Sequence, residues 1–519
     1  MKKLILVLIA FSLFFSVTGC AESHGYDDSI QELSGGNQSD FVTIERTEID
    51  SRTAESHVTF EQNDESSLEL ISDSSSLVDI ETESTHPPIP DVTFPIIQTL
   101  TILCDQQSKS FVEHLITSFR ISNPYIIVEM ICVEGDSNTY TAEVATALQN
   151  KNGADIVLLC DSRITKNTIS LIQADRFADI NALNSKYGYL NWNDYEETIL
   201  DAGVFGNERY FLPVFYEIPL LIGIQDHLSA ADVAYGKGVT FSQFTQSLAN
   251  REKLIFRNPI LPEGMYSDLG LNTIDQWNKT VNLKDEKLHA FIEGYNSLFP
   301  QILNGKYRSY VSQSNTYENA LIGDLLAGDV LFLNNTATSN TPQFSNLPYL
   351  ADIYSAILSE NHTPILTTLP NTDGSETVYG RLGWCLGIRK GSENEDAALR
   401  FLAHAVSFEQ YYSDSKYRGI PVNKTFNEAT KVAYYENANH SNSNQIVGTE
   451  AYMSDSAAIT SDFLDSYYDI ISRVRIPRGV DVEHLNRLCN LFTDMQRNQT
   501  NIKDALQKVS EAFIEVFIN

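Results

Sequence analysis

The chain has 519 residues, of which 42% are apolar, and a formal net charge of −32. A chain of this length and apolar content buries enough surface for about two or three domains, so a single small module is excluded. Phosphate backbones bind clustered Lys and Arg, and because this chain is strongly acidic we expect no nucleic-acid partner.

The N-terminus has the layout of a secretory signal peptide. Lys2 and Lys3 precede a mostly apolar run at residues 4–17, which is short for a membrane span of about twenty residues. The sequence Val-Thr-Gly before Cys20 resembles the bacterial lipobox. We therefore expect a lipoprotein signal peptide over residues 1–20 and a lipidated Cys20 that anchors the mature chain to the outer face of the cell membrane. The alternative is an uncleaved anchor helix, and both interpretations place the body outside the cytoplasm.

The next segment, residues 21–95, has the composition of a disordered tether. It contains 18 acidic residues, 20 Ser and Thr, and only two basic residues, Arg46 and Arg52. Such a segment does not bury enough apolar area to offset the entropy that it loses on ordering. As a random coil of about 75 residues it spans roughly 50 Å. We expect it to hold the body away from the membrane.

Five cysteines follow the lipobox, and an odd number does not pair completely within one chain. Cys104, Cys132 and Cys160 lie in or at the end of apolar runs, where a thiol behaves as a small apolar side chain. The sequence leaves open the oxidation state of these three and of Cys385 and Cys489. No CxxC motif or Cys/His cluster with zinc spacing occurs, so we expect no bound zinc and no cofactor.

After the tether, strand and helix patterns alternate. Apolar runs at residues 100–104, 125–133 and 154–160 are typical of strands, and amphipathic runs at residues 111–119 and 140–149 are typical of helices. Apolar strands joined by helices of this length predict a parallel sheet covered on both faces. Ligands on such sheets bind beyond the carboxyl ends of the strands. Here those ends carry polar residues, at 105–108, 134–136 and 161–163.

A second group of elements follows an extended stretch at residues 211–219. Because this group contains its own strands and helices, it predicts a second sheet rather than an extension of the first. The strands are expected at residues 220–224, 329–333 and 364–368, and the helices from Thr240 and at 288–298 and 317–327.

Six short motifs then occur in a characteristic order. They are Phe-Leu-Pro at 211–213, Thr-Phe-Ser-Gln-Phe at 240–244, Leu-Ala-Gly-Asp-Val-Leu-Phe at 326–332, Leu-Pro-Asn-Thr-Asp-Gly at 369–374, Gly-Trp-Cys-Leu-Gly-Ile at 383–388, and Gly-Ile-Pro-Val-Asn at 419–423. In this order they resemble the family 1 extracellular solute-binding proteins of ABC importers, the group that includes maltose-binding protein. The resemblance covers most of residues 97–425. Phe241 stands where the family has Trp, and Trp192 and Trp277 have no counterpart, which leaves the ligand class open.

The resemblance implies an α/β protein with a type II periplasmic-binding-protein-like fold, in which a multi-strand hinge joins two lobes behind the disordered tether. It implies an N-terminal lobe of residues 96–212 plus 370–425 and a C-terminal lobe of residues 213–369 plus 426–519. The last of these segments shows amphipathic helices but no distinctive motif.

The chain is then expected to cross between the lobes three times, near residues 212–216, 369–373 and 421–427. Extended crossings absorb a rotation in a few backbone angles, so the lobes are expected to close on a ligand and exclude water.

A sugar ligand needs polar groups for its hydroxyls and an aromatic face for its C–H surface. Side chains of these types occur at the strand ends, at the crossings and in the family motifs. The candidate ligand-binding residues are Gln106, Asp161, Ser162, Tyr216, Glu217, Asn334, Asn335, Tyr379 and Trp384. No catalytic residue and no metal ligand is expected.

The candidates also have structural alternatives. Asp161 is placed to cap a helix, and the asparagines at 334–335 to hydrogen-bond the backbone of their own loop. Tyr216 and Glu217 lie at the predicted hinge, and Trp384 precedes an apolar strand, so all three are also suited to structural roles.

The resemblance implies a monomeric, non-enzymatic substrate-binding lipoprotein that delivers a mono- or oligosaccharide to the ABC permease subunits in the membrane. Two alternatives stay open: a surface sensor or adhesion lipoprotein of the same fold, and a secreted glycoside hydrolase. The hydrolase is the weaker, because Gly-x-Ser-x-Gly and His-Glu-x-x-His are absent and Ser413-Asp-Ser-Lys416 lacks a Lys-Thr-Gly partner. The ligand class also stays open toward peptides, polyamines and anions, although no Arg cluster favours phosphate.

Overall fold

The chain divides at Phe94 and Pro95 into two units, and the fold described below belongs to the second. The computed structural model describes residues 97–160, 166–249, 251, 254–257, 260, 262–271, 273–275, 277–282, 284–303, 317–334, 347–407, 419–439, 460–477, 501, 504 and 507. The predicted signal peptide, Cys20 and the predicted tether lie outside these residues. Among the helices described, none has the length and apolar character needed to cross a membrane.

The first lobe is built on a five-stranded sheet with the strand order β2-β1-β3-β16-β6. The three predicted strands are β1 (Gln98–Asp105), β2 (Ile126–Val133) and β3 (Ile156–Cys160), and they are parallel as predicted. The sheet is not parallel throughout, because β16 (Trp384–Ile388) runs antiparallel to β3 and β6 (Leu212–Pro213). β16 enters the lobe at the carboxyl edge of β3, so it has to run in the opposite direction.

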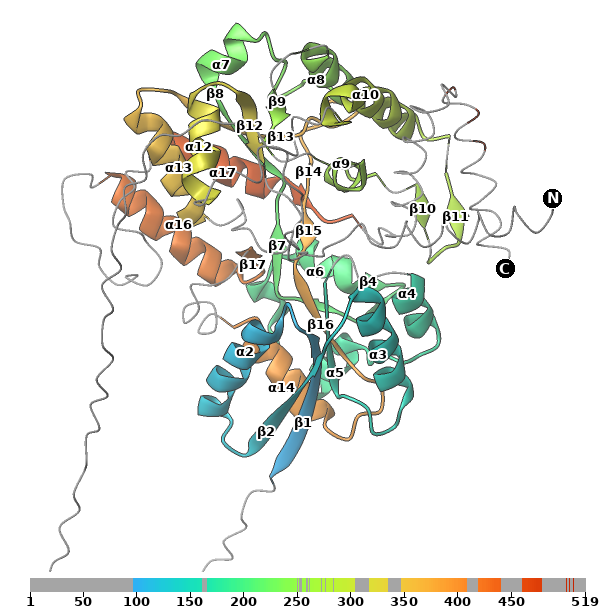
Figure 1. The fold of residues 1–519 in the computed structure, drawn as a ribbon. Coiled ribbons are helices and arrows are strands. Elements are labelled where there is room, and N and C mark those ends of the chain that lie inside the picture. Colours follow the sequence, from blue (N-terminus) through green and yellow to red (C-terminus); the bar gives the residue numbers. More distant parts are fainter. Residues whose placement is uncertain are drawn as a thin grey trace, which may run out of the picture. The chain divides into compact units, whose positions relative to one another are not determined.

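Helices cover both faces of this sheet (Figure 1). α2 (Lys109–Ser122) and α14 (Glu395–Ala405) lie on one side, and α3 (Ser137–Gln149) lies on the other. α2 has the apolar spacing of a helix that buries one stripe. The buried residues of α2 are Phe111, Val112, Leu115, Ile116 and Phe119.

The second lobe is built on a separate four-stranded sheet, as predicted, with the strand order β13-β8-β12-β9. The strands are β8 (Leu220–Ile224), β9 (Leu254–Phe256), β12 (Val330–Asn334) and β13 (Pro364–Thr368). β12 is parallel to β9, and both β12 and β13 are antiparallel to β8. β9, β12 and β13 therefore end at one edge, the edge at which β8 begins.

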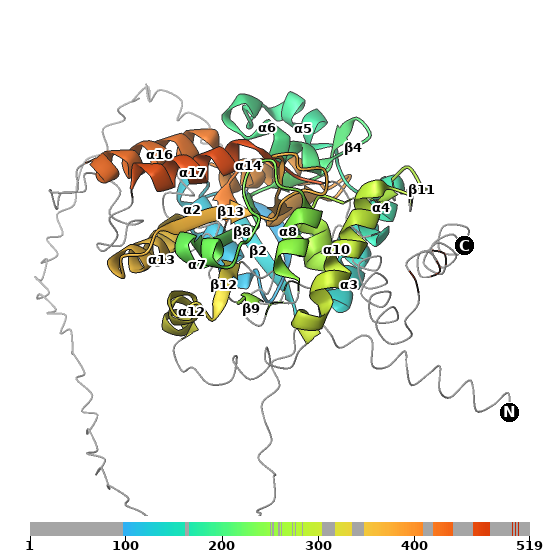
Figure 2. The ribbon, with the colours of Figure 1, turned by 90° about the horizontal axis from the view of Figure 1, so that it is seen from above.

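Two helix layers cover the second sheet (Figure 2). α8 (Phe241–Leu248) and α10 (Glu286–Leu303) lie on one side, and α12 (Tyr317–Leu326), α13 (Leu347–Ser359) and α17 (Ser461–Ser472) lie on the other. The sequence alternates accordingly. Leu221 and Phe332 belong to the core under α8 and α10, whereas Ile222 and Leu333 belong to the core on the other face.

The predicted helix start at Thr240 is confirmed by a capping box. The Thr240 hydroxyl accepts from the backbone N–H of Gln243, and the Gln243 side chain accepts from the backbone N–H of Thr240. Phe241, which stands where the resembled family has Trp, is fully buried and lies 6.4 Å from the ring of Phe291 in α10. This departure from the family pattern therefore lies in the core of the second lobe.

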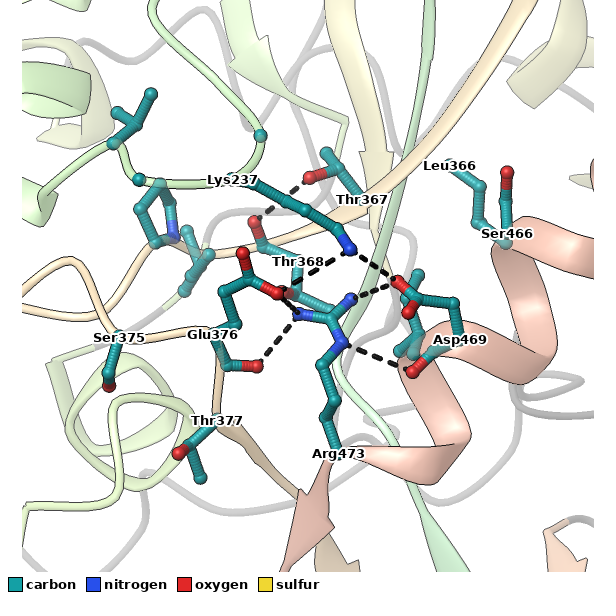
Figure 3. Close-up of a pocket in the computed structure, with 16 residues that line it drawn as sticks. Lys237, Leu366, Thr367, Thr368, Ser375, Glu376, Thr377, Ser466, Asp469 and Arg473 are labelled. Carbon is teal, nitrogen blue, oxygen red and sulfur yellow. Dashed lines mark hydrogen bonds and ion pairs between the residues drawn. The ribbon is translucent and has the colours of Figure 1, made fainter.

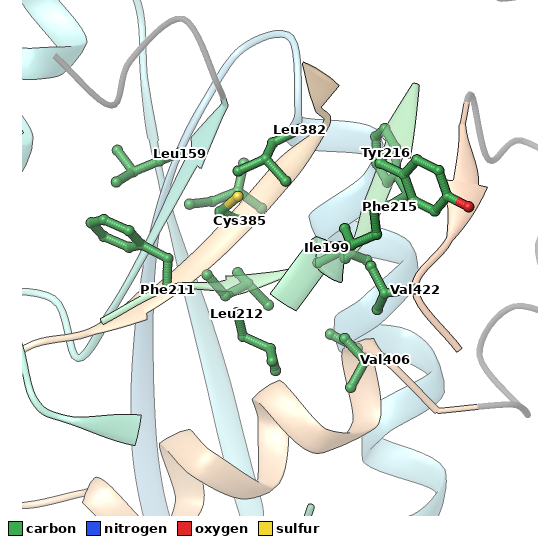
Figure 4. Close-up of a cluster of buried hydrophobic side chains, with 14 of the residues drawn as sticks. Leu159, Ile199, Phe211, Leu212, Phe215, Tyr216, Leu382, Cys385, Val406 and Val422 are labelled. Atoms are coloured by element: carbon green, nitrogen blue, oxygen red, sulfur yellow. The ribbon is translucent and has the colours of Figure 1, made fainter. Parts of the chain in front are cut away.

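The two lobes are joined by a three-stranded sheet of the order β15-β7-β17, which we call the hinge sheet. Its strands are β7 (Phe215–Glu217), β15 (Arg381–Leu382) and β17 (Ile420–Pro421). Tyr216 is the register partner of both Leu382 and Ile420. Figure 4 shows the apolar side chains that pack here. The hinge sheet confirms that the chain crosses three times.

The second crossing lies later in the chain than the predicted residues 369–373. Asn371 is tied to the second lobe, because its backbone carbonyl accepts from the N–H of Phe241 at 2.9 Å. Its side-chain amide also donates to the carbonyl of Thr377 at 2.6 Å. β14 (Val378–Tyr379) then pairs with β18 (Val474–Arg475), and only β15 reaches the hinge sheet.

Candidate ligand-binding site

The carboxyl edge of the first sheet places two of the predicted residues at the end of the lobe that adjoins the hinge sheet. Gln106 directly follows β1 and is exposed. Its Oε1 accepts a hydrogen bond from Cys132 Sγ at 3.0 Å, so β2 helps to orient the amide. Trp384 begins β16 opposite Cys160, the last residue of β3. An amide and an indole therefore lie on the edge where ligands of α/β sheets bind.

Trp384 is half-buried between two aromatic rings. Its ring centroid lies 4.3 Å from that of Phe111 in α2 and 5.3 Å from that of Phe215 in the hinge sheet. These neighbours fix the orientation of the indole, and the remaining surface stays open. The geometry agrees with a ligand-stacking face and also with the structural role that the sequence leaves as an alternative.

The carboxylates at the strand ends are used to start helices. Asp105 is buried and accepts from the backbone N–H of Ser108 at 2.9 Å, in the turn that leads into α2. Asp136 caps α3, because its carboxylate accepts from the N–H of Thr139 at 2.8 Å. These hydrogen bonds lower the pKa of Asp136 below its usual value. Neither carboxylate is arranged as a general acid or base.

The hinge-sheet candidates differ from each other. Tyr216 is only 1% exposed, so in this conformation its ring belongs to the hinge core and not to a surface open to solute. Burial, and secondarily Glu196, raise the pKa of its hydroxyl. Glu217 is half-buried and is the register partner of Arg381. Of these two side chains, only Glu217 is placed to reach a ligand.

An ion pair that the sequence analysis missed links the hinge sheet to the second lobe. Arg381 Nε donates to Asp268 Oδ1 at 3.0 Å, and Asp268 ends α9 (Pro262–Asp268). Asp268 is buried, which raises its pKa, while the Arg381 guanidinium lowers it and so opposes the effect of burial. The partners lie 113 residues apart, so no local sequence signal could have found them.

The second-lobe candidates are partly covered. Asn334 is 2% exposed and is the last residue of β12. It lies at the edge of the second sheet where β8 begins, just after the hinge strand β7. Tyr379 is half-buried, and its ring covers Gly270 so closely that a Cβ there would overlap it. Asp161, Ser162 and Asn335 lie outside the described residues.

A pocket of about 180 Å³ lies beside the carboxyl end of β13, and it contains none of the nine predicted residues. Figure 3 shows two cations and two anions around it. Lys237 Nζ lies 3.5 Å from Glu376 Oε2 and 3.4 Å from Asp469 Oδ2, and Arg473 Nη2 lies 3.0 Å from Asp469 Oδ2. Because the opposite charges pair with each other, the pocket favours neither a cationic nor an anionic ligand.

The hydroxyls of the pocket, by contrast, suit a neutral polar ligand. They come from β13, the segment before β14, and α17, and belong to Thr367, Thr368, Ser375, Thr377 and Ser466. Two sequence signals mark this pocket: the Leu-Pro pair that opens the motif at 369–374, and the Gly-Lys-Gly stretch at 236–238, whose two glycines have positive φ. In the described part of the chain, no three His, Cys, Asp or Glu side chains gather to hold a metal ion.

No family model and no curated protein matches the sequence. Solved structures do match the fold. The sugar-binding protein MalE from Xanthomonas citri has a TM-score of 0.58 at 14% identity, with 81% of this chain and 98% of that chain covered. An ABC substrate-binding protein from Listeria monocytogenes in complex with cycloalternan has a TM-score of 0.52 at 12% identity, with 81% and 98% covered.

A third structure, the GacH receptor of Streptomyces glaucescens, which was solved without ligand and with acarbose, has a TM-score of 0.51 at 13% identity. The match covers 82% of this chain and 100% of the GacH chain. Together these similarities confirm the predicted fold class: the chain has a type II periplasmic-binding-protein-like fold with two α/β lobes.

Proposed function

We propose that the protein is an extracytoplasmic substrate-binding lipoprotein of an ABC importer, a member of the family 1 solute-binding proteins, and that it captures a mono- or oligosaccharide. The observation that carries this proposal is the hinge sheet. It joins two α/β lobes whose sheets both present an edge of strand ends to it. The similar structures named above bind sugars, which supports the ligand class.

Binding is a closure of the two lobes on the solute. Gln106 and Trp384 approach it from the first lobe, Glu217 from the hinge sheet, and Tyr379 from the second lobe, whereas Asn334, like Tyr216, is buried in this conformation. The hinge strands are short and absorb the rotation in a few backbone angles. Solute that binds the closed form more tightly raises its population, and the importer reads that form.

The charged side chains near the strand ends favour a neutral ligand. Arg257 directly follows β9, but its Nε lies 2.8 Å from the carboxylate of Asp324. Arg381 is likewise paired with Asp268. With its guanidinium groups already engaged by carboxylates, this region is poorly suited to bind phosphate or sulfate. An amide, a carboxylate and an indole are the groups that bind hydroxyls and sugar rings.

The protein is proposed to bind without catalysing a reaction. The strand-end carboxylates of Asp105 and Asp136 already accept hydrogen bonds from the turns that begin α2 and α3. A glycoside hydrolase needs two carboxyl groups that face the scissile bond. Asp105 and Asp136, which are engaged in these helix starts, are not arranged as such a pair.

Anchoring and delivery complete the proposal. Cys20 carries the lipid, residues 21–95 form the tether, and the monomeric body presents its closed form to two permease subunits. A sensor or adhesion protein would bind the same solute, so delivery is tested by uptake of labelled sugar in cells with and without the gene.

The ligand class is tested by thermal unfolding of the purified protein with a panel of mono- and oligosaccharides. A bound sugar at 100 times its Kd raises the free energy of unfolding by about 2.7 kcal/mol, because only the folded state binds it. No shift with any sugar, together with a shift by a peptide or polyamine, would overturn the ligand class. Turnover of a glycan would overturn the non-enzymatic role.

A further inference from the structure

Two cysteines lie side by side on adjacent strands of the first sheet. Cys104 in β1 and Cys132 in β2 are register partners in a parallel pair, and both are free thiols. Register partners place their side chains on the same face, and neighbouring strands lie about 4.8 Å apart. Disulfides span Cα separations of about 4.4–6.8 Å, so this pair can close with little movement of the backbone.

The two thiols differ in exposure. Cys104 is 0% exposed, whereas Cys132 is half-buried and lies on β2, at the edge of the sheet. Burial and the neighbouring Cys132 raise the pKa of Cys104 to about 12. An oxidant from solution therefore reaches Cys132 first, and Cys104 is the slower partner.

The structure describes the side chain of a third cysteine, Cys385, which is not placed to form a disulfide with Cys104. Cys385 lies in β16 and is the register partner of Leu159 in β3. The register of β1 with β3 pairs Leu103 with Val157, so Cys385 and Cys104 are on opposite faces of the sheet. Cys385 is also buried.

We propose that Cys104 and Cys132 form a reversible disulfide that controls the orientation of Gln106 at the solute site. The Cys132 thiolate attacks one sulfur of a low-molecular-weight disulfide, such as oxidised glutathione, and releases one glutathione thiolate. The Cys104 sulfur then attacks the Cys132 sulfur, which forms the Cys104–Cys132 bond and releases the second glutathione. The two cysteine protons end on the two released thiols.

The link to the solute site is the hydrogen bond between Cys132 Sγ and Gln106 Oε1. A disulfide sulfur carries no proton, so oxidation removes this donor. Gln106 then loses the bond that orients its amide, and solute affinity falls by about two- to tenfold. This consequence rests on the proposed function, whereas formation of the disulfide does not.

Disulfide formation is tested on the purified protein with oxidised glutathione, followed by peptide mapping under non-reducing conditions. The expected product is a cross-linked pair of peptides that contain Cys104 and Cys132, with the mass of two hydrogen atoms lost. Its rate of formation rises with pH, because both attacking thiols have to ionise. Free Cys104 and Cys132 after oxidation, or a bond from Cys132 to another cysteine, overturns the proposal.

Three variants separate the two chemical steps. Cys104→Ser stops at a mixed disulfide of glutathione with Cys132, and Cys132→Ser leaves Cys104 unmodified. The matched control, Cys385→Ser, forms the cross-link like the wild type. Glutathione on Cys104 in the Cys132→Ser variant would contradict the proposed order of attack.

The consequence for binding is measured by calorimetry with the sugar found in the thermal screen, on the oxidised and the reduced protein. The expected result is weaker binding by the oxidised form and no redox effect in Cys132→Ser. Equal affinities after complete cross-linking would overturn the role of Gln106. If no sugar binds in either redox state, the proposed function fails, and the mapped cross-link still decides the disulfide.

Discussion

The indole of Trp277 in the second lobe packs against the ring of Phe205 in the first lobe, with ring centroids 5.7 Å apart. Trp277 lies between β10 (Ile274–Asp275) and β11 (Thr280–Val281), in the segment that follows Leu271 of the second-lobe core. Phe205 ends β4 (Val204–Phe205) and packs against Phe211 of the first-lobe core, with ring centroids 6.0 Å apart. Besides the hinge sheet, the lobes therefore share an aromatic contact.

We predict that Trp277→Ala favours the open form. An aromatic pair contributes about 0.5–1.5 kcal/mol beyond its buried area, so its loss raises the ratio of open to closed forms by roughly two- to tenfold. Small-angle scattering without solute should show a larger radius of gyration. The control is Trp192→Ala, since Trp192 contacts Arg209 within the first lobe at 4.9 Å. Equal scattering by both variants would contradict the prediction.

A second prediction concerns the aromatic face at the first-sheet edge. Trp384→Leu should lower sugar affinity by about tenfold, because it removes the ring that stacks on the sugar, whereas Trp384→Phe keeps a ring and most of the affinity. Calorimetry measures both. Thermal unfolding of each variant reports the lost packing against Phe111 and Phe215 separately. If the two variants bind sugar equally well, Trp384 is a structural residue only.

The sequence predicted the two sheets because their strands and helices are local patterns. Apolar runs identified β1, β2 and β3, and the motif order identified β7 and β17 as crossings. The second crossing was misplaced, because Asn371 lies in a turn motif and only its contacts with Phe241 and Thr377 show which lobe holds it. A turn motif determines where the chain bends, but it does not determine which lobe the turn packs against.

The candidate site was predictable in its location more than in its side chains. Polar residues do follow the strands, but Asp136 is used to cap a helix, which local hydrogen bonding favours at a strand-to-helix turn. Tyr216 has a ligand-like chemistry, yet its side chain is buried in the hinge core. Burial depends on what packs against each face of the sheet, which only the tertiary structure shows.

The ion pair between Arg381 and Asp268 gives a third prediction. Arg381→Gln leaves the buried Asp268 carboxylate without its cation, and breaking a buried pair costs about 3–5 kcal/mol. Chemical denaturation measures the loss. The double variant with Asp268→Asn should recover part of the stability, because it also removes the uncompensated charge. A double variant less stable than Arg381→Gln alone would contradict this assignment.

The same variant should change the pH dependence of stability. Burial already raises the folded-state pKa of Asp268, and Arg381, which lowers it, is absent in Arg381→Gln. A carboxyl group with a raised folded-state pKa is protonated more readily in the folded state. The variant should therefore be most stable at acid pH and lose stability as the pH rises from the unfolded pKa through the folded pKa of Asp268. A parallel stability profile for wild type and variant across that range would show that Asp268 is not the group affected.

The last prediction concerns the close approach of backbone and ring in the hinge sheet. Gly383 lies between β15 and β16, and a Cβ at this position would overlap the ring of Phe215. Gly383→Ala has to displace that ring from the hinge core, and overpacking of this kind costs about 1–3 kcal/mol. Thermal unfolding should show a lower midpoint, and because Phe215 also contacts Trp384, sugar affinity should fall with it.

Gly323→Ala is the matched control. Gly323 lies in α12, where a Cβ has no heavy atom within 4 Å, so alanine there should be neutral or stabilise the helix by up to about 1 kcal/mol. Gly383→Ala as stable as Gly323→Ala would mean that the hinge core tolerates the methyl group. The crossing at β15 would then be loosely packed, and rotation of the lobes would not depend on a fixed contact between Gly383 and Phe215.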